Sequence, residues 1–270
     1  MNYEKQRRLW RYIFLTIFAL FSAFPFYFII VSSTNMSVDI IKGRLHFGTH
    51  LFQNFKTLLA TVNLGQAFWN SMRNALVNTI ASLLICSLAG YGFQIYREKS
   101  KDMLMSLLLL SMMVPFATLM VPLFRLFSQL HLLDSTIGFV LPSVSTAFLI
   151  FFFRQSAESF PYETLHAARV DGLGEFGIFF RIFIPIMAPT FAAAAIVTFM
   201  NAWNSYLWPL IIMQSQSSRT MPLLITGLTA GYTTDYGILM LAVTITTLPT
   251  MILFFTQQKR FVEGVLGSVK

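Results

Sequence analysis

Six long apolar stretches are the feature that most constrains the fold of this chain. They lie at residues 10–31, 72–96, 103–124, 137–153, 183–212 and 236–257. A helix that crosses the hydrocarbon core of a membrane needs about 20 mostly apolar residues. Only 11% of the 270 residues are charged and 56% are apolar, whereas a soluble domain carries about 25% charged residues. The sequence therefore predicts an all-α integral membrane protein with six transmembrane helices.

The positive charges predict how these helices are oriented. The first stretch follows MNYEKQRRLWR and is longer than the apolar core of a cleaved signal peptide, so we expect it to remain as an anchor. Cytoplasmic segments of membrane proteins carry an excess of Lys and Arg. Alternation from a cytoplasmic N-terminus places 13 of the 19 Lys and Arg residues on that side, namely Lys5, Arg7, Arg8, Arg11, Arg97, Lys99, Lys101, Arg154, Arg169, Arg181, Lys259, Arg260 and Lys270. Both termini are therefore predicted to be cytoplasmic.

This topology predicts the organisation of the chain. Its parts are a cytoplasmic N-terminus at 1–9, the anchor helix at 10–31, an extracytoplasmic segment at 32–71, a five-helix core at 72–257 and a cytoplasmic tail at 258–270. The core contains a cytoplasmic loop at 154–182, which is the second longest connection. Long connections tend to be functional.

The charge and cysteine content exclude several classes of protein. The net charge is +8, but the basic residues form short clusters and no continuous basic face, which argues against a nucleic-acid partner. The single cysteine, Cys86, excludes an intramolecular disulfide and a cysteine-rich metal site. Inside the six stretches there is no Asp, Glu or Lys, and Arg occurs only near their ends. Ion-driven carriers usually place such groups at membrane depth, so an ion-coupled carrier is disfavoured.

The fifth stretch contains a group of polar and aromatic residues in FMNAWNSYLWPL. Asn201 and Asn204 are three residues apart and share a helical face, with Trp203, Tyr206 and Trp208 interleaved. Amides and aromatic faces together suit a neutral, polyhydroxylated ligand. The alternative is a belt of aromatic residues at the membrane surface.

The loop before this stretch reads LHAARVDGLGEFGIFFRIFIPIMAP and contains a formal G-x-G-x-x-G, GLGEFG. A dinucleotide site requires a strand before the first glycine and a helix after the last. Here the preceding residues have a helical composition, so the match is accidental. No G-x-x-x-x-G-K-[ST] motif occurs in the sequence, and the chain is not expected to bind nucleotide itself.

The same loop predicts a short helix. Ser159 is a plausible N-cap, Pro161 suits the first turn and Glu163 suits the helix N-terminus. Gly172 is expected to end the helix in the left-handed conformation. Pro185 and Pro189 are expected to redirect the chain into the next membrane span.

This loop resembles the coupling loop of permease subunits of ATP-binding-cassette importers, whose signature is approximately E-A-A-x-x-D-G followed by I-x-L-P. The matching segments are HAARVDG at 166–172 and IFIP at 182–185, with His166 in place of the glutamate and Leu173 in place of an alanine. The segments 113–142, 201–210 and 261–270 are similar to the carbohydrate, maltose-type branch of that family, and the resemblance extends over nearly the whole chain.

The resemblance implies a multi-pass permease in the bacterial inner membrane that imports a neutral di- or oligosaccharide and is not an enzyme. It implies four kinds of partner: two cytoplasmic ATPase subunits, a second permease, an extracytoplasmic solute-binding protein and the sugar. The chain itself would bind no cofactor and no metal, since the ATPase hydrolyses ATP. The residues implied in ATPase coupling are Pro161, Glu163, His166, Ala167, Ala168, Asp171 and Gly172. Those implied at the junction are Ile182, Pro185 and Pro189, and those in the substrate path are Asn201, Trp203, Asn204 and Tyr206.

Three alternatives are left open at this point. The same kind of complex imports glycerol phosphates in some members of the family. A second possibility is a stand-alone channel or ion-coupled carrier. The third is a membrane-embedded enzyme, for which Asp39, His46 and His50 form the only suitable group of metal-ligating residues.

Overall fold

The computed structural model describes residues 2–267, and all regular structure in this part of the chain is helical, which confirms the predicted all-α class. The chain divides into two compact units. The first contains the N-terminal part through Leu64 together with Leu224–Leu248. The second contains Gly65–Leu223 together with the C-terminal part from Pro249 onward. Each unit is described in turn.

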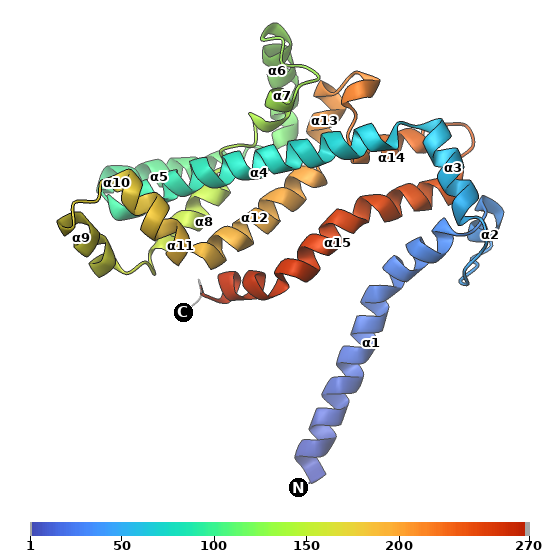
Figure 1. Ribbon diagram of the computed structural model, residues 1–270, viewed down its shortest axis with the longest axis horizontal. Coiled ribbons are helices and arrows are strands. Elements are labelled where there is room, and N and C mark those ends of the chain that lie inside the picture. The colour runs from blue at the N-terminus through green and yellow to red at the C-terminus, as the bar shows by residue number, and fades with distance from the viewer. Residues whose placement is uncertain (1, 268–270) are drawn as a thin grey trace. The chain divides into compact units, whose positions relative to one another are not determined.

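The first unit contains a long N-terminal helix and two short helices. These are α1 (Asn2–Ser33), α2 (Ser37–Ile41) and α3 (Leu51–Thr61), joined by the beginning of α15 (Tyr236–Gly267). The most apolar 18-residue window of α1 is 0% buried, and the helix is continuous in Figure 1, with a bend in its C-terminal part. Such a fully exposed apolar helix is suited to contact with lipid.

The polar side chains of Asn54 and Asp235 hold the loops of the first unit in place. The side chain of Asn54 on α3 donates hydrogen bonds to the carbonyls of Ser33 and Asn35, at 2.9 and 3.0 Å. Asp235 accepts hydrogen bonds from the backbone N–H of Gly237 at 2.9 Å and from the Ser37 hydroxyl at 2.7 Å. Asp235 therefore caps the start of α15 and ties it to α2.

The second unit is built around the long helix α4 (Leu64–Ile95). Its other helices before the predicted loop are α5 (Lys99–Ser111), α6 (Phe116–Gln129), α7 (Thr136–Val140) and α8 (Ala147–Ala157). The later ones are α9 (Tyr162–Val170), α10 (Glu175–Ile178), the π-helical turn η1 (Phe179–Phe183), α11 (Ile184–Ile186), α12 (Ala188–Trp203), α13 (Leu207–Ile212), the short 3₁₀ turn η2 (Gln216–Ser218) and α14 (Met221–Leu228). The last residues of α14, from Leu224 onward, belong to the first unit.

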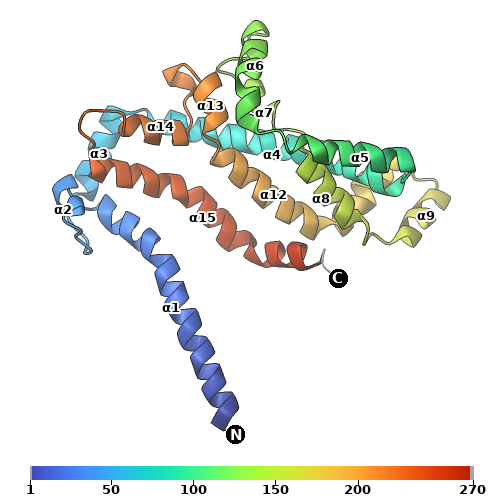
Figure 2. The same ribbon diagram turned by 180° about the vertical axis from the view of Figure 1, so that it is seen from behind.

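Helices α4, α5 and α8 pack together at one end of the second unit (Figures 1 and 2). Phe153 of α8 is fully buried there, and Gly90 of α4 lies so close to it that a Cβ would meet the Phe153 side chain. Arg154 of α8 donates a hydrogen bond to Asp102 of α5, and Arg97 lies 3.5 Å from the same carboxylate. Apolar packing and an ion pair therefore fix α8, which leads into the predicted loop.

Three of the predicted spans are not single straight helices. The stretch 103–124 is interrupted between α5 and α6, which meet at 94°. Pro115 ends the break: it has no N–H to continue a helix and forms the N-cap of α6. The stretch 137–153 is divided by non-helical residues 141–146, where Pro142 occurs and Thr146 caps α8 through its hydroxyl.

The stretch 183–212 is interrupted as well. The segment Glu175–Ile186 meets Ala188–Ile212 at 82°, with Met187 at the break. Pro185 lies just before the break and Pro189 in the first turn of α12, where a missing N–H is tolerated. The expected redirection of the chain by these two prolines is confirmed, while the expectation of one continuous helix is wrong.

By length and composition, three helices suffice to cross a membrane within the described residues, or five if each bent pair counts as one span. These are Arg7–Ser33, Leu64–Ile95 and Tyr236–Gln258, with the pairs α5–α6 and Glu175–Ile212. Helix α8 has 11 residues and reaches only about 17 Å, against about 30 Å of hydrocarbon. Six crossings and cytoplasmic termini therefore stay predictions. Helix α4 begins at Leu64, so residues 64–71 of the predicted extracytoplasmic segment belong to it.

Candidate functional site

The predicted short helix is present as α9 (Tyr162–Val170). Its N-cap is Pro161 and not Ser159, because the Ser159 hydroxyl donates to the carbonyl of Ser156 at 2.8 Å and makes no cap. Gly172 has φ of +79°, and nothing lies within 4 Å of where its Cβ would be. The left-handed turn expected there is confirmed. Glycine is favoured at this position by its positive φ, and not by a lack of room for a side chain.

The two sides of α9 differ in exposure. Leu165 and Ala168 are 1% and 5% exposed and pack into a core with Phe160, Phe179 and Phe183. The opposite side leaves Pro161, Glu163, His166, Ala167, Asp171 and Gly172 exposed. Of the two alanines in the predicted coupling motif, only Ala167 is therefore available to another protein.

A charged contact closes the turn that follows α9. The Arg169 Nε donates to Glu175 Oε1 at 2.8 Å. Arg169 is in the last turn of α9, and a positive charge is stabilised near a helix C-terminus. Glu175 is in the first turn of α10, and a negative charge is stabilised near a helix N-terminus. Both helix ends and the ion pair therefore stabilise the same geometry.

The predicted junction residues lie between α10 and α12. Ile182 is in the π-helical turn η1 and packs at the edge of the core that holds Leu165 and Ala168. Pro185 and Pro189 are exposed on either side of the 82° bend. The segment is thus a sharp corner through which the chain passes from the α9 region into α12.

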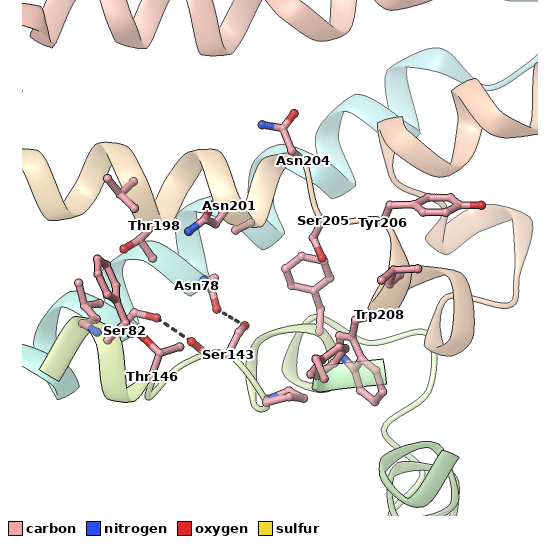
Figure 3. Close-up of a pocket in the computed structure, with 18 residues that line it drawn as sticks. Asn78, Ser82, Ser143, Thr146, Thr198, Asn201, Asn204, Ser205, Tyr206 and Trp208 are labelled. Atoms are coloured by element: carbon pink, nitrogen blue, oxygen red, sulfur yellow. Dashed lines mark hydrogen bonds between the residues drawn. The ribbon is translucent and has the colours of Figure 1, made fainter. Parts of the chain in front are cut away.

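The second unit also contains a pocket of about 510 Å³ between α4, α7, α8 and α12. Ligand pockets usually have volumes of about 300 to 1,000 Å³. Its lining comprises Asn78, Ser82, Phe116, Phe139, Pro142, Ser143, Thr146, Phe148, Leu149, Val197, Thr198, Asn201, Ala202, Asn204, Ser205, Tyr206, Leu207 and Trp208. None of these described residues is charged. Figure 3 shows Thr198 and Asn201, near the C-terminal end of α12, on one side of the pocket and Ser82, Ser143 and Thr146 on the other.

Two kinds of polar group line the pocket. Some are already engaged: the Ser143 hydroxyl donates to Asn78 Oδ1 at 2.8 Å, and the Thr146 hydroxyl accepts from the Leu149 N–H at 3.3 Å. Others, namely the side chains of Asn201 and Tyr206, form no hydrogen bond with any side chain or backbone group that the structure describes. The latter are available to a solute.

Three of the four predicted substrate-path residues line the pocket, and one does not. Asn201, Asn204 and Tyr206 line it, although Asn204 points away from the Asn78–Ser143 pair and donates to the Met200 carbonyl at 2.9 Å. Trp203 does not line it. That side chain is 1% exposed and packs against Phe68, with ring centroids 5.5 Å apart.

Trp208 is the tryptophan that does line the pocket. Its indole N–H donates to the Gly138 carbonyl at 3.0 Å, and its ring packs edge-on against Phe116 and Phe127. The indole is therefore held in one orientation, with α13 and α7 joined through it. Sequence reasoning named this residue only as one of the interleaved aromatics.

No local pattern in the sequence assigns the polar residues of α4 and of the α7–α8 connection to a site. Asn78 and Ser82 are four residues apart and therefore on one face of α4. Ser143 and Thr146 lie in the non-helical segment 141–146. The interruption of the fourth stretch brings these hydroxyls to the pocket, and the sequence pattern had suggested an unbroken helix there.

The group Asp39, His46 and His50 is arranged around an arginine. Arg44 donates to Asp39 Oδ2 at 3.0 Å through one nitrogen and to His46 Nε2 at 2.8 Å through Nε. The guanidinium therefore occupies the position between Asp39 and His46. Within the described residues no group of three or more metal-ligating side chains is assembled.

The family described as binding-protein-dependent transport system inner membrane component matches residues 82–266. The chain belongs to this family. This membership confirms the resemblance to importer permeases. The matched region contains α9, the bend at Met187 and most of the pocket.

Several transport permeases of this kind are similar over almost their whole length. The lactose transport system permease protein LacG of Rhizobium radiobacter is 46% identical over 96% of this chain and 95% of its own. The arabinooligosaccharides transport system permease protein AraQ of Bacillus subtilis is 35% identical over 96% and 94%. The sn-glycerol-3-phosphate transport system permease protein UgpE of Yersinia pestis is 29% identical over 96% of both.

A solved structure shares the fold of this chain. It is described as a bacterial ABC transporter involved in the import of the acidic polysaccharide alginate, and it matches with a TM-score of 0.82 and 19% identity. The match includes 97% of this chain and 98% of the other. The chain therefore has the fold of a chain of that transporter.

Proposed function

We propose that this chain is a permease subunit of an ATP-driven importer for a neutral di- or oligosaccharide, and that the pocket forms part of the sugar path. The observation that carries the proposal is a charge-free pocket with unengaged amide and hydroxyl groups in a protein of the importer family. The names of the relatives agree, since they transport lactose and arabino-oligosaccharides.

The chemistry of the pocket suits sugars better than phosphates. Asn201 and Tyr206 offer hydrogen-bond donors and acceptors to hydroxyl groups, and the Trp208 and Phe148 side chains offer apolar surface for the C–H faces of a sugar ring. A phosphate ester favours Arg or Lys in its binding site, and no described residue of the lining has that charge. A sugar is therefore favoured over a glycerol phosphate.

The proposed topology has six crossings with both termini in the cytoplasm of a bacterium. Basic residues at 97–101, 154–181 and 259–270 would all be cytoplasmic, as the positive-inside rule favours. In this arrangement the exposed side of α9 faces the cytoplasm. Two ATPase subunits would bind there, a second permease would complete the pathway and a solute-binding protein would deliver sugar to the outside.

The path of the chain supports a mechanical link from α9 to the pocket. From Gly172 the chain passes through α10, η1 and the bend at Met187 into α12. Asn201 lies 13 residues into α12, or about 20 Å along it. ATP binding shifts access to the pocket only if the ATPase favours one position of α9 over the other.

Uptake by the reconstituted complex tests the proposal. The chain is assembled in proteoliposomes with its ATPase, second permease and binding protein, and uptake of radiolabelled lactose and arabino-oligosaccharides is measured. Wild type should accumulate a neutral sugar only with ATP, and Asn201→Ala should lower uptake about fivefold, as expected for a lost polar contact of about 1 kcal/mol.

The matched control is Gln216→Ala, an exposed amide outside the pocket lining, which should keep wild-type uptake. ATP-independent uptake, or uptake of glycerol 3-phosphate but no sugar, contradicts the proposed function. Unchanged uptake by the Asn201 variant contradicts the placement of the sugar path.

A further inference from the structure

The carboxylate of Glu175 connects two helices that are far apart in the sequence. Oε1 accepts from Arg169 Nε at 2.8 Å, and Oε2 accepts from the Tyr91 hydroxyl at 3.0 Å. Arg169 belongs to α9 and Tyr91 to α4. One carboxylate at the start of α10 therefore binds the end of α9 with one oxygen and the end of α4 with the other. Arg169, Glu175 and Tyr91 are called the α9 clasp below.

Neighbouring contacts hold the members of the α9 clasp in place. Tyr91 is 5% exposed, and its ring packs edge-on against Phe179 and Phe183, with centroids 5.5 and 4.9 Å away. The Arg169 guanidinium lies over the Tyr96 ring, 5.7 Å from its centroid. Charge-assisted hydrogen bonds with such fixed partners are about twice as strong as neutral ones.

The position of Tyr91 on α4 gives the α9 clasp a mechanical meaning. Helix α4 is continuous from Leu64 to Ile95 and contributes Asn78 and Ser82 to the pocket. Ser82 is nine residues from Tyr91, or about 14 Å along the helix. A displacement of α9 transmitted through Glu175 therefore reaches the pocket along α4, in addition to the covalent route through α12.

We propose that Arg169, Glu175 and Tyr91 are positioning residues that couple α9 to α4, so that the movement of α9 acts on both helices that line the pocket. This inference rests on the proposed function, in which the ATPase moves α9. Apolar packing of Leu165 and Ala168 keeps α9 attached to its core. The α9 clasp adds the directional connection to α4.

The test measures sugar transported per ATP hydrolysed by the complete complex in proteoliposomes. Glu175→Ala breaks both hydrogen bonds, while Tyr91→Phe removes only the bond to α4 and keeps the aromatic packing. Each should lower the transport-to-ATPase ratio about fivefold or more, the lower end of usual coupling strengths, while ATPase activity continues.

The matched control is Glu158→Ala, another carboxylate of the same loop, which is exposed and, among the described residues, accepts a hydrogen bond only from Gln155 of α8. It should leave the ratio unchanged. A wild-type ratio in both Glu175→Ala and Tyr91→Phe overturns the proposal. So does an equal fall of transport and ATPase activity with loss of assembled complex, since that shows a role in folding alone. Failure of the wild-type complex to couple ATP to sugar uptake instead contradicts the proposed function.

Discussion

The α9 region and the pocket belong to the same compact unit but are built from opposite chemistry. Around α9 the contacts are charged and directional, as in the bond between Arg169 and Glu175 at 2.8 Å. In the pocket the polar groups are amides and hydroxyls, and none of its described lining residues is charged. The α9 region is suited to transmitting a movement of α9 to the rest of the unit, and the pocket is suited to binding a neutral solute.

This difference indicates how one chain separates energy input from solute contact. Charged contacts fix geometry because they are strong and oriented. Neutral hydroxyls and amides bind a hydroxylated solute without holding it tightly, because each exchanges one hydrogen bond with water for another. Changes in the α9 region should therefore affect coupling, and changes in the pocket should affect the solute.

The largest expected effect comes from Gly172. Gly172→Val places a β-branched residue at φ of +79°, a conformation that costs an L-residue about 1–2 kcal/mol and a branched one more. The turn after α9 should rearrange, and sugar uptake should fall about tenfold or more, as a shift above 1.4 kcal/mol requires. Uptake in proteoliposomes and membrane insertion are both measured. Gly174→Ser, at an ordinary φ of −72°, is the control, and normal uptake by the Val variant would contradict the role of α9.

A charge placed in the pocket is the next strongest test. Asn201→Asp should lower uptake of a neutral sugar about fivefold to tenfold, because the sugar must displace water from a carboxylate that lacks a partner, at about 1–1.4 kcal/mol. ATPase activity should change little. Gln216→Glu adds the same charge outside the pocket and should be harmless. Equal losses in both variants would mean that the charge of the pocket is irrelevant to the solute.

The two alanines of α9 distinguish its inner and outer sides. Ala168→Leu adds bulk to a residue that is 5% exposed and should destabilise the complex by about 1–3 kcal/mol. Ala167→Leu, on the exposed side, should leave the unfolding temperature unchanged but reduce the amount of ATPase that co-purifies. Unfolding in detergent and co-purification are measured for both. If the two variants behave alike, the assignment of the sides is wrong.

The smallest expected effect concerns Asp134, which accepts hydrogen bonds from the Ser218 hydroxyl and the Ser215 N–H and so joins two loops. Burial alone would raise the pKa of Asp134, but the hydrogen bonds from Ser218 and Ser215 outweigh it and lower the pKa. A lowered pKa contributes stability above the ordinary value, and this contribution is lost as the pH falls through the folded-state pKa.

Unfolding of detergent-solubilised protein between pH 7 and pH 3 measures this contribution. Wild type should lose about 1 kcal/mol over that range from this site. Asp134→Asn should be less stable at pH 7 and lose correspondingly less on acidification. Identical pH dependence of the two proteins would show that the carboxylate does not contribute.

The sequence predicted the features that depend on local chemistry. The left-handed Gly172, the short helix before it and the redirection at Pro185 and Pro189 follow from backbone preferences of single residues, and all are present. Apolar length predicted where membrane helices lie. It did not predict the breaks at Pro115 and at 141–146, because uniformly apolar stretches have no periodicity that marks a kink.

The pocket was only partly predictable for the same reason. Asn201 was singled out by its spacing from Asn204, and Tyr206 as an interleaved aromatic residue. Trp203 is interleaved in the same way and yet is buried against Phe68. Which aromatic faces a cavity depends on tertiary packing. The α9 clasp likewise joins residues 84 positions apart, a pairing that no local pattern specifies.

The role of α9 is tested most directly by measuring on which side of the membrane it lies and whether the ATPase covers it. Ala167→Cys is made in a Cys86→Ser background, and the chain is treated with a membrane-impermeant maleimide. If α9 is cytoplasmic and binds the ATPase, the cysteine introduced at position 167 should be labelled in inside-out vesicles stripped of the ATPase, protected when the ATPase is restored, and unlabelled in intact right-side-out vesicles. Labelling from the outside, or labelling that the ATPase leaves unchanged, would contradict this role of α9.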